Sequence, residues 1–116
     1  ASIVSQNKQY CTPSSIDSSV SSKGQEDHVS RGANAATKLQ KVLDNIKTIL
    51  AIELLTASQA LFFRDGKTSP FLESFLNAFR AEIPFSEEDR IIQEDIENAR
   101  NFIDNLNLER DILFNE

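Results

Sequence analysis

The strongest concentration of chemically useful side chains is the run Gln25, Glu26, Asp27 and His28. It places a carboxamide, two carboxylates and the only histidine in consecutive positions. A carboxylate beside a histidine can carry out acid-base chemistry when burial or nearby charge moves the pKa values toward the working pH. The same run also fits an exposed polar loop in which Asp27 or Ser30 caps the following helix. The residues alone leave both interpretations open.

Motifs that would supply a complete active site are missing from the sequence. It contains no glycine-rich dinucleotide or phosphate-binding motif, no HExxH and no GxSxG. The acidic clusters at 87–89 and 94–95 have no histidine or cysteine nearby, and acids favour the first turn of a helix. We therefore expect no metal site.

Composition excludes several classes of partner. The formal charge of −6 argues against nucleic acid, because phosphate neutralisation needs clustered lysine and arginine. The most apolar run, 49–63, contains Glu53, which a bilayer would exclude, so no membrane contact is expected. Cys11 is the only cysteine and can form no intrachain disulfide, which favours a reducing compartment and predicts a cytoplasmic location.

Three amphipathic segments must position this loop. Apolar residues recur every three or four positions from about 33 to 63, which predicts one long helix. Its second half is apolar around most of its circumference, so it should be a buried helix. Gly66 is expected to end it.

Two shorter helices are predicted to follow. Ser69 and Pro70 have the residue types of an N-cap and a first helical position, and Phe71, Phe75 and Phe79 then share one packing face. Pro84 should end this helix, and the segment 86–89 (SEED) should open the next. The buried stripe of that last helix is expected to comprise Ile92, Ile96, Ala99, Ile103 and Leu106.

The predicted fold class is all-α: a long buried helix and two shorter antiparallel helices, preceded by a serine-rich loop. Residues 1–32 would form a truncated helix end and the loop, and residues 33–116 a C-terminal helical domain. Because serine-rich arms are often flexible, a non-enzymatic helical interaction module whose arm folds on a partner also fits this pattern.

The order and spacing of several segments closely resemble the histidine ammonia-lyases. They are 5–8 (SQNK), 12–18 (TPSSIDS), 24–30 (GQEDHVS), 51–61 (AIELLTASQAL), 88–90 (EDR) and 95–97 (DIE). The resemblance covers nearly the whole chain. It implies the C-terminal fragment of a larger helical-bundle lyase that eliminates ammonia from L-histidine to give trans-urocanate.

Within this resemblance, the residue type at position 26, here Glu26, indicates the substrate. The phenylalanine lyases of the same superfamily have an amide at this position, whereas the tyrosine lyases have closely similar segments. Three residues depart from the common pattern: Gln6 where glutamate is frequent, Lys23 where asparagine is frequent and Arg31 where methionine is frequent. A tyrosine or phenylalanine lyase, or an aminomutase of the same family, therefore stays open as an alternative.

The resemblance also implies a prosthetic group. Family members use a methylidene-imidazolone electrophile built from an Ala-Ser-Gly triplet, and no glycine of this chain follows an Ala-Ser pair. The family's tyrosine base lies upstream, and Tyr10 does not match it. We therefore expect this chain alone to be inactive.

The family's site residues carry over onto four positions. Gln25 and Glu26 would line the active site, with Glu26 catalytic through substrate binding or proton transfer, and Asp27 and His28 would support the loop. The resemblance further implies a homotetramer whose active sites are assembled from several subunits. Helices of neighbouring subunits would then cover the long apolar helix.

Overall fold

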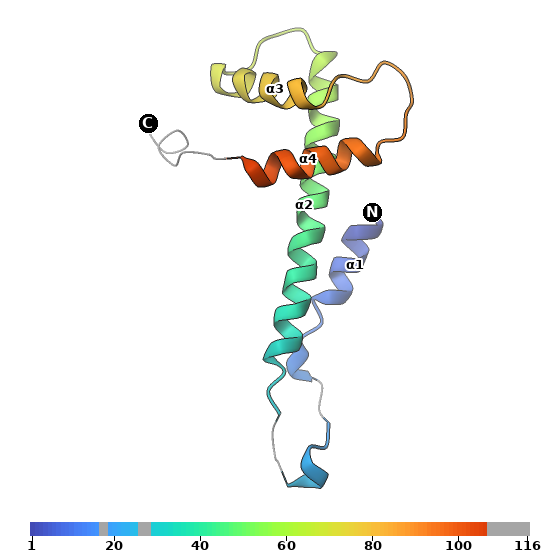
Figure 1. Cartoon of the computed structure of the whole chain (residues 1–116), viewed down its shortest axis with the longest axis vertical. Coiled ribbons are helices and arrows are strands. Elements are labelled where there is room, and N and C mark those ends of the chain that lie inside the picture. Colours follow the sequence, from blue (N-terminus) through green and yellow to red (C-terminus); the bar gives the residue numbers. More distant parts are fainter. Residues whose placement is uncertain (17–18, 26–28, 107–116) are drawn as a thin grey trace. The chain divides into compact units, whose positions relative to one another are not determined.

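The computed structural model describes residues 1–16, 19–25 and 29–106 of the chain. Those residues form four α-helices, α1 (Ser2–Tyr10), α2 (Gly32–Phe62), α3 (Pro70–Glu82) and α4 (Gln93–Asn105), and two short 3₁₀ turns, η1 (Ser14–Ile16) and η2 (Ser22–Gly24). The described part contains no strand (Figure 1). The all-α prediction is confirmed, and the long helix lies within one residue of its predicted span.

The chain divides into two compact units, Ala1–Ile49 and Leu50–Glu116. The long helix α2 contributes its first part to the first unit and its last part to the second. Among the described helices, none combines the length and the hydropathy that a membrane span requires.

Polar contacts hold the first unit together. The side-chain amide of Asn45 on α2 donates to Gln6 Oε1 at 3.0 Å and to Asn7 Oδ1 at 2.7 Å, so it joins α2 to α1. One turn earlier, the Lys41 ammonium lies 5.4 Å from the centroid of the Tyr10 ring. No residue of α1 is buried, so these contacts, rather than an apolar core, fix α1 beside α2.

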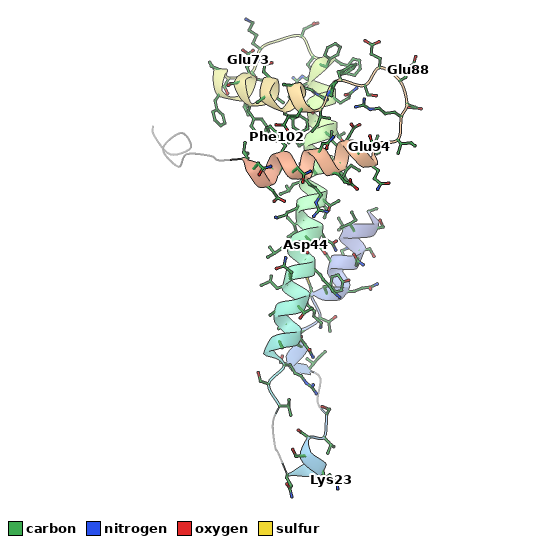
Figure 2. The ribbon with its side chains drawn as sticks, viewed as in Figure 1. Lys23, Asp44, Glu73, Glu88, Glu94 and Phe102 are labelled. Carbon is green, nitrogen blue, oxygen red and sulfur yellow. The ribbon has the colours of Figure 1, made fainter. Side chains whose placement is uncertain are left out.

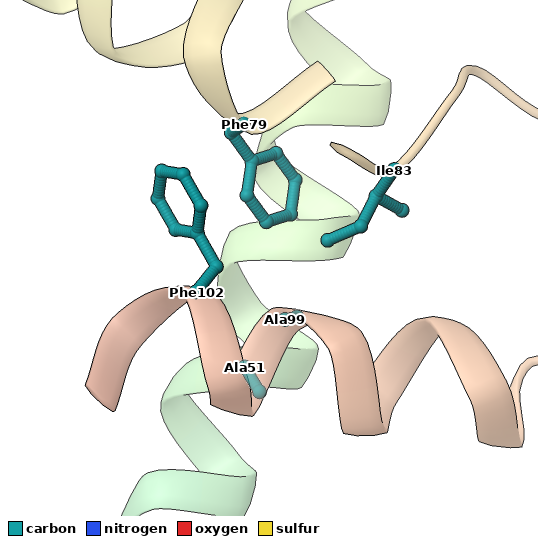
Figure 3. Close-up of a cluster of buried hydrophobic side chains, with 5 residues drawn as sticks. All are labelled: Ala51, Phe79, Ile83, Ala99 and Phe102. Carbon is teal, nitrogen blue, oxygen red and sulfur yellow. The ribbon is translucent and has the colours of Figure 1, made fainter. Parts of the chain in front are cut away.

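An apolar core holds the second unit together. Its buried members are Ala51 from α2, Phe79 from α3, Ile83 after α3, and Ala99 and Phe102 from α4. Figure 3 shows these side chains converging from the three helices. The Phe102 ring packs edge-on against Phe79, with centroids 5.2 Å apart, and against Phe75, with centroids 5.6 Å apart. Such pairs add about 0.5–1.5 kcal/mol beyond the area they bury.

The start of α3 follows the sequence prediction. Ser69 has extended backbone angles and its Oγ accepts a hydrogen bond from the Leu72 amide at 3.3 Å, and Pro70 is the first helical residue. This arrangement satisfies one amide that the first helical turn would otherwise leave without an acceptor. In Figure 1, α3 and α4 run in opposite directions, as predicted for the two short helices.

The predicted start of the last helix is wrong. The segment 86–89 is a loop, and α4 begins at Gln93 without a side-chain cap. Ser86 is engaged elsewhere: its carbonyl accepts from Gln59 Nε2 at 2.7 Å and its hydroxyl donates to the Glu88 carbonyl at 2.7 Å. The acidic residues of the first turn of α4 are Glu94 and Asp95.

Arg80 organises the loop after α3. Its guanidinium donates to Ser58 Oγ at 2.8 Å, to Gln59 Oε1 at 3.3 Å and to the Ile83 carbonyl at 3.3 Å. Burial lowers the pKa of Arg80 from its usual value; the positive charge of Arg90 lowers it further, and Asp95 raises it. The hydrogen bonds compensate for this loss of hydration, so Arg80 joins α2 and α3 to the connecting loop.

The described residues leave most of the apolar circumference of α2 uncovered. Only Ala51 and Ser58 of its residues are buried. Leu39, Leu43 and Ile46 are 59%, 46% and 40% exposed. The expectation of a buried long helix is therefore met only where α3 and α4 pack against it.

Replacing Phe79 should disrupt the second unit. Phe79→Ala leaves a cavity at a fully buried site and should lower the free energy of unfolding by about 3–5 kcal/mol. Phe71→Ala is the matched control, because it makes the same change on the same helix at a side chain that is 39% exposed. Its loss should stay near 1 kcal/mol, the usual size for a point substitution. Urea unfolding followed by circular dichroism measures both, and equal losses would contradict this assignment of the core.

Candidate functional site

The candidate site is the loop between α1 and α2, and the structure describes only part of its predicted signature. Gln25 is described and exposed, directly after η2. Glu26, Asp27 and His28 lie outside the described residues. Their predicted roles, and that of Gln25, stay predictions.

Polar contacts hold the residues near both ends of this loop. Near the start, the Thr12 carbonyl accepts a hydrogen bond from Lys38 Nζ on α2 at 2.9 Å. Near the end, the Arg31 guanidinium donates to Ser19 Oγ, and the Gly32 amide donates to Ser30 Oγ at 3.3 Å. The loop is therefore held at its ends by polar contacts.

The tip of the loop has an unusual backbone conformation immediately before Gln25. Ser22, Lys23 and Gly24 have φ angles of +49°, +57° and +87°, and Figure 2 shows Lys23 at this tip. The Gly24 amide donates to the Ser21 carbonyl at 2.9 Å, and the Gln25 amide to the Ser22 carbonyl at 3.2 Å. Positive φ is costly for residues with a side chain and is concentrated at functional sites. This tight turn sets the direction in which the chain enters the QEDH run.

The three departures from the histidine ammonia-lyase pattern have visible consequences. Gln6 keeps an oxygen that accepts from Asn45 at 3.0 Å, which is what a glutamate would also offer. Arg31 adds a contact to Ser19 that methionine could not make. Lys23 occupies a left-handed position where asparagine is better tolerated.

Sequence reasoning missed the backbone strain at Ser22 and Lys23. Only Gly24 carried a signal for positive φ, because glycine adopts such angles without penalty. The polar junction of α1 and α2 through Asn45 was missed as well, since it joins residues 38 and 39 positions apart.

Comparisons with known proteins agree with the resemblance. The family model for aromatic amino acid lyases matches residues 1–81. The histidine ammonia-lyase of Anaeromyxobacter sp. (strain K) is 44% identical over 110 residues, which are 94% of this chain and 22% of that protein. The histidine ammonia-lyase of Gloeobacter violaceus is 48% identical over 101 residues, covering 85% of this chain and 20% of that protein.

A solved structure has the same fold. The crystal structure of histidine ammonia-lyase from Trypanosoma cruzi matches with a TM-score of 0.82 and 42% identity, over 89% of this chain and 21% of that one. The chain thus spans about a fifth of the length of the relatives it matches.

Glycine at position 24 should matter for the loop through its backbone alone. A Cβ at Gly24 would meet no atom within 4 Å, yet the φ of +87° strains any other residue. Gly24→Ala should therefore lower the free energy of unfolding by about 1–2 kcal/mol.

Gly32→Ala is the matched control, because Gly32 lies at the start of α2 and a Cβ there would meet only Ser30 Oγ at 3.4 Å. This change should be neutral or stabilise by about 0.4–1 kcal/mol. Urea unfolding of both variants checks the contrast. Equal effects of the two substitutions would rule out the left-handed conformation at Gly24.

Proposed function

Since this chain belongs to the aromatic amino acid lyase family, we propose that it is the C-terminal part of an enzyme that eliminates ammonia from L-histidine to give trans-urocanate. The assignment of L-histidine as the substrate rests on glutamate at position 26, within the segment GQEDHVS. The relatives named above are histidine ammonia-lyases, which supports the same assignment.

The electrophile of this reaction would come from outside this chain. The sequence has no Ala-Ser-Gly triplet, so the chain cannot form the methylidene-imidazolone group and should be inactive alone. The described part of the loop fits a role beside such a group, because Gln25 offers an exposed carboxamide directly after a constrained turn. When present, the group supplies the electrophile that promotes loss of ammonia.

We assign the polar run four roles within the assembled active site. Glu26 binds the ammonium or imidazole of the substrate through a charge-assisted hydrogen bond, or transfers a proton if desolvation raises its pKa. Gln25 lines the site beside it. Asp27 and His28 support the loop through hydrogen bonds.

Removing the charge of Glu26 tests this assignment. In the full-length enzyme, Glu26→Gln should lower turnover by about a hundredfold or more, the range for one positioned acid-base or charge-stabilising group. Gln25→Ala should lower it less. Urocanate formation from L-histidine, followed by ultraviolet absorbance, measures both variants. Wild-type turnover in a folded Glu26 variant would disprove the catalytic role.

Assembly into a homo-oligomer, a tetramer in the full-length enzyme, is the second part of the proposal. Leu39, Leu43 and Ile46 follow one another at four- and three-residue steps and share one exposed face of α2. Burial of apolar surface is worth roughly 25 cal/mol per Å². A second copy of the helix offers the same stripe and would bury it, as in left-handed helix pairs with this spacing.

The single cysteine and the family assignment support a cytoplasmic location for this enzyme.

A charge placed in this stripe should weaken self-association without unfolding the chain. Leu43→Glu is well suited, because Leu43 is 46% exposed and lies outside the core cluster. Gln40→Lys is the control, since it also places a charge on the same helix away from the stripe and keeps a favourable partner in Asp44, which accepts from Gln40 Nε2 at 3.2 Å.

Sedimentation equilibrium should find the wild-type chain and the Gln40 variant associated at tens of micromolar, and the Leu43 variant shifted toward monomer with unchanged helical circular dichroism. A folded wild-type monomer at that concentration would refute self-association through this face.

A further inference from the structure

Charge is distributed unevenly along the chain. Residues 1–49 carry six lysine and arginine side chains against four acidic ones, whereas residues 50–116 carry six against fourteen. The first unit therefore has a net charge of +2 and the second −8, although the whole chain is acidic. An anion would be attracted to the first unit and repelled by the second.

A pocket of about 600 Å³ lies in the first unit, between the start of the loop and the N-terminal half of α2. The loop contributes Thr12 and Ser14, and α2 contributes Asn34, Thr37, Lys38 and Lys41. Two of these residues are cationic, and none of the described residues that line the pocket is acidic. Pockets of this size take small molecules.

One wall of this pocket contains a polar atom that lacks a partner. Ser14 Oγ is buried and has no hydrogen-bond partner in the described part of the chain. Buried hydroxyls are nearly always paired, so this hydroxyl is free to turn about the Cα–Cβ bond toward a ligand in the pocket that Ser14 lines. A hydroxyl can donate to an oxyanion.

The two ammonium groups are held in place before any ligand arrives. Lys38 Nζ donates to the Thr12 carbonyl at 2.9 Å and has further N–H groups to donate. Lys41 Nζ lies 5.4 Å from the centroid of the Tyr10 ring. Groups fixed in advance lose less conformational freedom when they bind a ligand.

We propose that this pocket is a binding site for the phosphate or carboxylate group of a small molecule. Lys38 and Lys41 provide the charge, and the Ser14 hydroxyl donates a hydrogen bond to one oxygen. Asn34 offers a further amide donor. This site does not use the QEDH run and does not rest on the proposed lyase activity.

Titration of the chain with inorganic phosphate, followed by amide NMR shifts at constant ionic strength, tests the proposal. Saturable shifts should appear in residues 12–16 and 34–41. A parallel titration with acetate distinguishes a carboxylate site from a phosphate site, and sodium chloride controls for a simple salt effect. Saturation by either oxyanion but not by chloride is the expected result.

Variants identify the groups that bind. Combining Lys38→Ala with Lys41→Ala should weaken phosphate binding at least about tenfold, since it removes two charge-assisted contacts. Ser14→Ala, which deletes one atom, should weaken it measurably. Lys67→Ala removes the same charge in the second unit and should have no effect. Helical circular dichroism checks that each variant is folded.

Three results would overturn the proposal. They are shifts that do not saturate, an equal loss of affinity in the Lys67 variant, and wild-type affinity in the Ser14 variant. If the double lysine variant does not fold, Ser14→Ala and the charge-conserving Lys41→Arg decide. The arginine variant should keep its affinity within about tenfold, and a complete loss in it would also contradict the site.

Discussion

The second unit depends on the close packing of three helices around two alanines and two phenylalanines. Ala51 on α2 and Ala99 on α4 are both fully buried in one cluster, so small side chains occupy the place where these helices meet (Figure 3). Phe79 and Phe102 fill the space beside them. Arg80 then fixes the loop after α3 through Ser58 and Gln59 on α2. Apolar packing fixes the three helices against one another, and the hydrogen bonds of Arg80 position the loop that follows α3.

The first unit is built differently. Asn45, Lys38 and Lys41 join α1 and the start of the loop to α2 through polar contacts, without a buried residue in α1. Such contacts give less free energy than an apolar core. They nevertheless fix the start of a loop that carries the predicted active-site residues. Weak internal contacts are expected in a segment whose surroundings are completed by other subunits, which is the assembly that we propose.

The sequence predicted the elements that rest on local chemistry. The span of α2, the Ser69 cap and the burial of Phe79 follow from periodicity and capping rules and are confirmed. Phe71 was assigned to the same packing face, but it is 39% exposed. The start of α4 was predicted too early in the sequence, because the Ser86 carbonyl accepts a hydrogen bond from Gln59, which lies 27 residues away. Phe102 was left out of the predicted stripe although it lies three residues after Ala99, on the same helix face. The angles at Ser22 and Lys23 could not be predicted, since neither residue type favours positive φ.

The proposed substrate, L-histidine, rests on glutamate at position 26. The most direct measurement is an assay of the intact gene product with L-histidine, L-tyrosine and L-phenylalanine as separate substrates, each followed by the ultraviolet absorbance of its unsaturated acid product. Urocanate from L-histidine is the expected dominant product. Product from L-tyrosine or L-phenylalanine without urocanate from L-histidine would contradict this substrate assignment.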